Sequence, residues 1–205
     1  MASNEYDVST DKVRKKNYDN RITPELLSKM NHSFYNVEYN KGIVDMDYLK
    51  DLETINDINI LRRNMLLESS FNLRNAIMFN KIFFLNLPTG GGKTNTSMKL
   101  ALDILESSDA NRIIYAMPFI NIIEQNYDII RDNFNLSEDE SEIRKIYSAT
   151  ETIFNDKDDE FKSKIILQDS FFNYPVICTT FSTFFDSILR VKKEYKYKVS
   201  ALTNS

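Results

Sequence analysis

The chain has 205 residues, of which 42% are hydrophobic and 27% are charged, a balance typical of a globular protein and not of a disordered one. Its net charge of −4 at pH 7 argues against strong unaided binding to nucleic acid, so any DNA contact must be local. A single cysteine excludes an internal disulfide framework.

The sequence contains no apolar stretch long enough to span a bilayer, and residues 1–20 lack the apolar core of a signal peptide. We therefore expect a soluble cytoplasmic protein with no membrane partner. In that reducing compartment the lone Cys178 is expected to be a packed strand residue.

The N-terminal part of the chain is polar. Residues 1–25 mix acidic and basic side chains without a hydrophobic period, which favours a loosely attached segment over a basic arm that binds nucleic acid. His32, the only histidine, is expected at the surface of this extension and not as a ligand. Apolar residues return between Met46 and Phe79, and they predict one or two helices.

A strand, a glycine loop and a helix are predicted next. Ile82–Leu87 is an apolar run typical of a strand buried on both faces of a parallel sheet. The segment "LNLPTGGGKT" follows on, and it contains three of the four glycines of the chain. Helical spacing then resumes at Met98, Ala101, Leu102 and Leu105.

This context predicts a phosphate-binding loop, in which backbone N–H groups surround an anion at the start of a helix. Lys93 is expected to contact the β- and γ-phosphates, and the Thr94 hydroxyl to bind Mg²⁺, so ATP and Mg²⁺ are the predicted cofactors. The alternative is an ordinary glycine turn. The predicted cofactor-binding residues are Thr89, Gly90, Gly91, Gly92, Lys93 and Thr94.

Strands and helices continue to alternate after this loop. Strands are predicted at 112–117, 144–149 and 175–180, and helices at 119–134, 158–171 and 181–189. Such repeated units predict an α/β fold with a parallel sheet and helices on both faces. Ligands of such sheets bind beyond the carboxyl ends of the strands, so the strand-to-helix corners are the candidate sites.

Three segments carry a resemblance to a known family. The glycine loop differs from the general G-x-x-x-x-G-K-[ST] pattern because Leu87 stands at the first glycine position, and its form resembles that of superfamily 2 helicases and translocases. Together "LPTGGGKT", "RIIYAMPFINIIEQN" and "NYPVICTTFSTFFDSIL" resemble motifs I, Ia and Ic of the CRISPR-associated helicase–nuclease of type I systems. This resemblance covers about residues 60–205 and implies a P-loop NTPase with a RecA-like fold.

The resemblance also implies contacts to nucleic acid. Pro118, Phe119 and Gln125 match positions where the family's first RecA-like domain meets single-stranded DNA. Thr179 and Thr180 match positions that touch its phosphates without reading sequence. Each residue also has a purely structural interpretation: Pro118 as strand terminator, Phe119 as helix core, and the threonines as an N-cap pair.

Parts of the complete family machinery have no match in this sequence. No Asp-Glu pair follows an apolar strand, although ATP hydrolysis needs an acidic residue on Mg²⁺. The second RecA-like domain and a histidine-rich nuclease are also unmatched. We therefore expect residues 1–58 to be a partly helical extension or connector, and 59–205 an incomplete first RecA-like domain that does not hydrolyse ATP alone. An uncovered sheet edge would then favour self-association.

Three hypotheses follow. The first is the nucleotide-binding part of an ATP-dependent DNA helicase, with Lys93 as the catalytic lysine and a type I CRISPR surveillance complex as its partner. The second is a non-catalytic module that docks on the complete motor or on its recruiting complex. The third is a motor fragment of another superfamily 2 translocase, such as a restriction-enzyme subunit.

Overall fold

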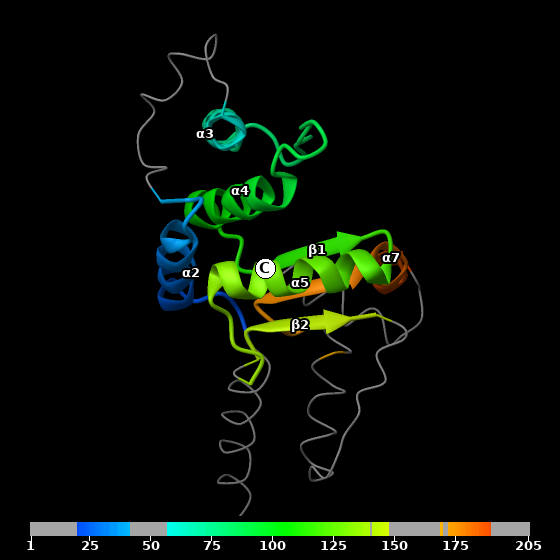
Figure 1. Cartoon of the computed structure of the whole chain (residues 1–205). Helices are drawn as coiled ribbons and strands as arrows, with labels where there is room; N and C mark the ends of the chain where they lie inside the picture. The colour runs from blue at the N-terminus through cyan, green and yellow to red at the C-terminus, as the bar shows by residue number, and fades with distance from the viewer. Residues whose placement is uncertain (1–19, 42–56, 140, 148–168, 170–171, 190–205) are drawn as a thin grey trace, which may run out of the picture. The chain divides into compact units, whose positions relative to one another are not determined.

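The computed structural model describes residues 20–41, 57–139, 141–147, 169 and 172–189, which form two compact units (Figure 1). The sheet unit comprises the described parts of Met1–Ile22, Asn111–Tyr127 and Ser137–Ser205. The loop unit comprises the described parts of Thr23–Ala110 and Asp128–Leu136, and it contains the glycine loop.

The sheet unit is built on three parallel strands in the order β1-β3-β2 (Figure 1). They are β1 at Ile113–Met117, β2 at Ile143–Ile146 and β3 at Val176–Thr180. Parallel neighbours need long crossover connections, which fits the predicted alternation of strands and helices. The predicted α/β fold with a parallel sheet is confirmed, as are the strands expected at 112–117 and 175–180.

The core of this sheet surrounds β3. Val176, Ile177 and Cys178 are fully buried, so the interpretation of Cys178 as a packed strand residue is confirmed. Burial raises the pKa of its thiol to about 12. Ile177 packs with Phe172 and Tyr174 in one buried cluster.

A polar contact closes the edge of that cluster. The Tyr174 hydroxyl donates to Asp169 Oδ1 over 2.6 Å, and Arg144 on β2 pairs with the same carboxylate at 3.0 Å. Burial, together with the hydrogen bond to Asp169, raises the pKa of Tyr174. These contacts join β2 to the segment that enters β3.

Two predicted helices follow the strands. Helix α5, Ile120–Phe134, buries Ile123, Tyr127, Ile130 and Phe134 at the predicted helical spacing. Helix α7, Phe181–Leu189, begins directly after β3 and contacts β1 and β3. Its apolar side chains are more exposed than the sequence led us to expect, with Leu189 at 69%.

The loop unit consists mainly of helices. They are α2 at Pro24–Asn36, α3 at Ile58–Ala76, α4 at Lys93–Ser107 and the last part of α5, from Asp128 on. Helix α4 contacts both α2 and α3. The predictions of a helix before the loop and of a helix after it are confirmed. Met98, Leu102 and Leu105 of α4 are buried, as their spacing predicted.

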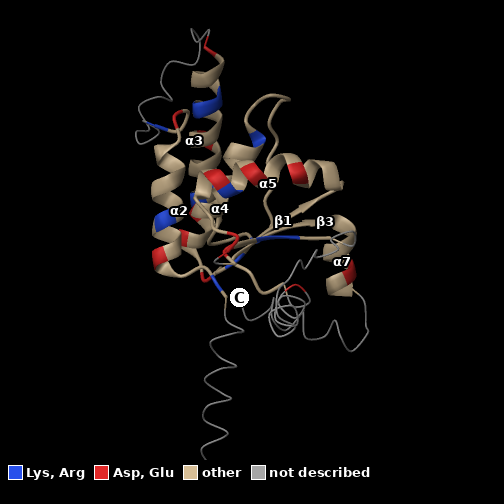
Figure 2. Cartoon of the chain, turned by 60° about the horizontal axis from the view of Figure 1, so that its bottom comes forward, with Lys and Arg blue, Asp and Glu red and all other residues tan. Residues whose placement is uncertain are grey.

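Helix α2 lies within residues 1–58, which were expected to be partly helical, but its bounds were not predicted. Thr23 caps the helix by accepting from Leu26 N over 3.2 Å, Pro24 occupies its first turn, and Leu26, Met30 and Phe34 are buried. His32 is exposed on this helix, as expected. Figure 2 shows acidic and basic positions on the same helices in this part of the chain.

The prediction of a buried strand at Ile82–Leu87 is wrong. This segment is irregular, and Ile82 and Phe84 are 78% and 96% exposed. Only Leu87, next to the loop, is buried. The physical reason is that no strand in the described residues pairs with this run, and an apolar run without a hydrogen-bonded neighbour does not form a strand.

Other predictions are partly outside the described residues. The strand expected at 144–149 forms as β2 but begins one residue earlier, and residues 148–149 are not described. The helix expected at 158–171 lies outside the described residues apart from Asp169. In the described part of the chain, none of the helices combines the length and apolar character needed to cross a membrane.

Candidate functional site

The glycine loop is bent in a way that requires its glycines. Gly90 and Gly92 have φ angles of 78° and 80°, in the left-handed region that glycine adopts without steric cost. Gly91 N donates to Pro88 O over 3.0 Å, and a Cβ on Gly91 would lie only 3.0 Å from that same oxygen. The three glycines therefore serve two purposes, backbone conformation and close approach.

The loop leads directly into α4. Gly92 is the N-cap residue, and its carbonyl accepts from Thr96 N over 2.9 Å. Gly92 has no side chain, so the N-cap residue makes no side-chain hydrogen bond to the first turn. An uncapped helix N-terminus carries partial positive charge and N–H donors, which favours an anionic ligand.

A cavity of about 630 Å³ opens beside this helix start. Five of the six predicted cofactor-binding residues line it: Thr89, Gly90, Gly92, Lys93 and Thr94. Lys93 is exposed, so its ammonium group is accessible. Gly91 is buried and does not line the cavity, because it forms the inside of the turn against Pro88.

Helix α3 adds residues that the sequence did not reveal. Arg62 Nε donates to Gly90 O over 2.8 Å, and its Nη1 donates to Asn59 Oδ1 over 3.2 Å. Arg62 and its neighbour Arg63 both line the cavity with Lys93, whereas none of the lining residues is Asp or Glu. In the sequence, the only sign of this cationic lining was the pair of adjacent arginines, which has no acidic residue next to it.

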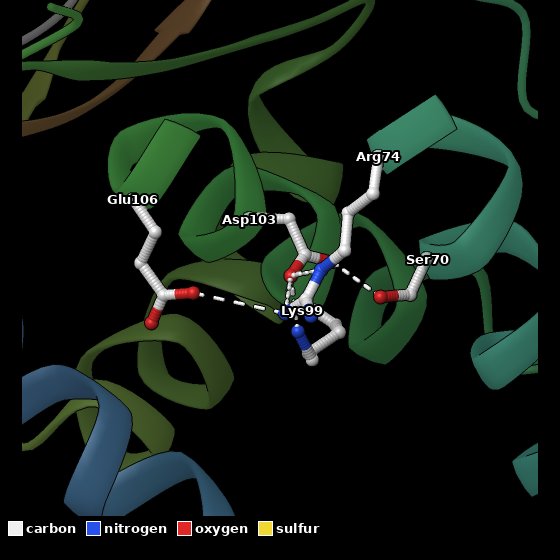
Figure 3. Close-up of polar contacts among 5 residues, drawn as sticks. All are labelled: Ser70, Arg74, Lys99, Asp103 and Glu106. Atoms are coloured by element: carbon white, nitrogen blue, oxygen red, sulfur yellow. Dashed lines mark hydrogen bonds and ion pairs between the residues drawn. The ribbon is translucent and has the colours of Figure 1, made fainter. Parts of the chain in front are cut away.

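An ion cluster around the buried Asp103 joins α3 to α4 (Figure 3). Asp103 of α4 is fully buried and accepts from Ser70 Oγ over 2.6 Å and from Arg74 Nε over 2.8 Å. Lys99, also buried, pairs with the same carboxylate. The hydrogen bond to Asp103 raises the pKa of Arg74. The cluster fixes the helix that carries Lys93 and Thr94 at its first turn.

The predicted nucleic-acid residues belong to the sheet unit. The register pairs Met117 with Thr180, so the carboxyl ends of β1 and β3 are neighbours. Pro118 and Phe119 directly follow β1, and both are exposed, Phe119 at 65%. Gln125 is exposed on α5. The sheet therefore brings the two predicted corners side by side.

The two threonines have structural partners. The buried Thr179 donates its hydroxyl to Ile146 O of β2 over 2.6 Å. Thr180 caps α7, because its Oγ1 accepts from Thr183 N over 3.1 Å. The interpretation as an N-cap therefore holds for Thr180 but not for Thr179, whose hydroxyl joins β3 to β2 instead. A phosphate contact by either of them stays a prediction.

One of two comparisons with known proteins found a match for this chain. A search of curated proteins found no match. The family model of ResIII, described as type III restriction enzyme, res subunit, matches residues 60–199 of the chain. The match spans the glycine loop, α4 and all three strands of the sheet. The chain therefore belongs to the ResIII family of type III restriction enzyme res subunits, a helicase-like family of superfamily 2.

Proposed function

We propose that the loop unit binds ATP with Mg²⁺ as the nucleotide-binding part of a DNA-translocating motor. The observation that carries this proposal is the cavity at the glycine loop. It combines an uncapped helix start with three cationic side chains, Arg62, Arg63 and Lys93, and no lining carboxylate. In a chain of net charge −4, such a lining favours a polyanionic ligand.

The residues present fit such a ligand. A cavity of about 630 Å³ is within the size range of small-molecule sites, about 300–1,000 Å³. The ammonium group of Lys93 would bind the β- and γ-phosphates, and the Thr94 hydroxyl would hold Mg²⁺. When bound there, Mg²⁺ would neutralise part of the phosphate charge.

The sheet unit is proposed to contact single-stranded DNA. Phe119 supports this assignment, because its ring is 65% exposed at the carboxyl end of β1. Exposed aromatic rings stack on bases without regard to sequence, and Pro118 and Gln125 are accessible beside it. Phe119→Ala should weaken binding of a fluorescent single strand, whereas Phe71→Ala, at an exposed phenylalanine of α3, should not.

Two biological systems fit this motor. The segments "PFINIIEQN" and "NYPVICTTF" support the helicase–nuclease of type I CRISPR systems, which would be recruited to a DNA-bound surveillance complex. The family match equally supports a restriction-enzyme motor. Binding of the purified chain to a DNA-bound surveillance complex, compared with binding to a restriction modification subunit, would decide between them.

Equilibrium titration with Mg·ATP tests the nucleotide site. Lys93→Ala removes a charge-assisted hydrogen bond worth about 1.5–3 kcal/mol, so affinity should fall about 10- to 150-fold. Lys81→Ala is the matched control, because Lys81 is exposed near the loop and does not line the cavity. Equal affinity of wild type and Lys93→Ala would refute the proposal.

A second candidate function is a non-catalytic binding module. One feature of the sequence favours this candidate: no Asp-Glu pair follows a predicted apolar strand. Steady-state ATPase assays separate the two candidates. Binding of Mg·ATP without turnover supports the module, whereas turnover that Lys93→Ala abolishes supports the motor.

A further inference from the structure

The cavity beside the glycine loop has a second kind of lining that phosphates do not need. Tyr39, which follows α2, and Ile129 of α5 both face it from within the loop unit. Tyr39 is 46% exposed and Ile129 is 43% exposed, although both are large and largely apolar. Leu66 of α3, which is buried, adds further apolar surface to the same lining.

Tyr39 is fixed at its polar atoms. Its hydroxyl accepts from Asn133 Nδ2 over 2.6 Å, and its carbonyl oxygen accepts from Arg63 Nε over 3.4 Å. The next residue, Asn40, is fully buried and exchanges two hydrogen bonds with Asn95 on the first turn of α4. The ring is therefore held in place beside the cavity while much of its surface stays uncovered.

A held, exposed aromatic ring is suited to stacking against a flat ligand. Base stacking on a protein aromatic ring changes affinity by about 5- to 150-fold, and it tolerates any base because every base has a π-face. An exposed aliphatic side chain such as Ile129 can cover the other parts of a base. The cationic lining binds phosphate, so one ligand can satisfy both kinds of lining.

We propose that Tyr39, with Ile129, forms the base-binding wall of this cavity, and that the site takes a nucleoside triphosphate in preference to bare polyphosphate. This inference rests on the proposed nucleotide site and adds the part of the ligand that the glycine loop does not contact. It assigns a substrate-binding role to the segment after α2, which lies outside the matched family region of 60–199.

The test compares Mg·ATP with inorganic tripolyphosphate on the full chain. Tyr39→Ala should weaken Mg·ATP about 5- to 150-fold and leave tripolyphosphate within about twofold. Tyr39→Phe keeps the ring and should bind both probes nearly as the wild type does. Phe71→Ala is the matched control, because Phe71 is also 46% exposed but does not line the cavity, and it should change neither affinity.

Other outcomes separate this inference from the proposed function. Equal weakening of both probes by Tyr39→Ala, or of neither, overturns the base-binding wall and leaves the phosphate site standing. If the wild type binds neither probe, or Lys93→Ala changes neither affinity, the nucleotide site itself is refuted. Should Tyr39→Ala fail to fold by circular dichroism, Tyr39→Leu replaces it, because leucine keeps the apolar bulk and loses the stacking face.

Discussion

The sheet unit and the loop unit are stabilised in different ways. In the sheet unit, two parallel strands flank the central strand Val176–Thr180, whose first four residues are buried. In the loop unit, three helices are joined by buried polar contacts, with Asp103 between α3 and α4 and Asn40 against Asn95. The apolar run Ile82–Leu87 was expected to be a strand, but it forms none and so adds no strand pairing to the loop unit.

The difference shows how the candidate site is positioned. In the described residues the glycine loop has no strand in front of it, so its geometry depends on the helices around it. Arg62 of α3 holds Gly90 O, and Asp103 joins α3 to the helix that follows the loop. Stability and ligand binding in this unit should therefore respond to polar substitutions, whereas the sheet unit should respond to loss of apolar volume.

The largest expected effect comes from Asp103→Ala in the loop unit. This change leaves the buried ammonium group of Lys99 without its partner, and breaking a buried pair costs about 3–5 kcal/mol. Urea unfolding measures the loss, and hydrogen exchange should show it first in α3 and α4.

Glu106→Ala is the control for that change. Glu106 lies on the same helix, 3.7 Å from Arg74, but it is 42% exposed, so its removal should cost less than about 1 kcal/mol. Equal losses from the two substitutions would mean that the buried cluster does not stabilise the loop unit.

Ile177→Ala addresses the sheet unit. Ile177 is fully buried between Phe172 and Tyr174, and truncating a buried isoleucine costs about 2–5 kcal/mol. Hydrogen exchange should then increase in β1 and β3 more than in α3 and α4. The same increase in both units would show that they unfold together, which would contradict the view that they are stabilised separately.

Thr180→Ala is expected to have a smaller effect, confined to one helix end. Loss of the hydroxyl that accepts from Thr183 N should cost about 0.5–2 kcal/mol. Thr180→Ser keeps the cap and should restore most of the stability, as measured by urea unfolding. A Thr180→Ala variant as stable as the wild type would reopen the prediction that this hydroxyl serves a ligand.

The smallest expected effect is the pH dependence of the stability that Tyr174 contributes. Its pKa is raised in the folded chain by burial and by Asp169. This contribution to stability is therefore complete below the unfolded pKa near 10 and is lost as pH rises through the folded pKa. The difference in unfolding free energy between wild type and Tyr174→Phe should be constant from pH 7 to 9 and shrink above about pH 10.

Much of the fold could be predicted, because the spacing of apolar residues and the composition of short runs indicate which segments are buried. The runs 112–117 and 175–180 are apolar and bounded by turn residues, and both form strands. Ile82–Leu87 has the same composition, but a strand also needs a neighbour, and a local pattern cannot report one. The bounds of helix α2 were not predicted, because no hydrophobic period was recognised in the polar segment that surrounds it.

Only the part of the candidate site that lies in one continuous segment could be predicted from the sequence. The glycine loop is contiguous, so its spacing revealed Lys93 and Thr94. Arg62 and Tyr39 come from other elements, and only folding brings them to the cavity. Lys99 and Asp103 stand four residues apart on α4, and both are buried in the structure, where α3 contacts α4.

Whether the glycine loop binds the phosphates of ATP can be decided by a crystal structure of the chain with Mg²⁺ and a non-hydrolysable ATP analogue. We expect the β- and γ-phosphates to contact the backbone between Gly90 and Thr94 and the side chain of Lys93, with Mg²⁺ on the Thr94 hydroxyl. Nucleotide bound elsewhere, with the glycine loop occupied only by water, would contradict it.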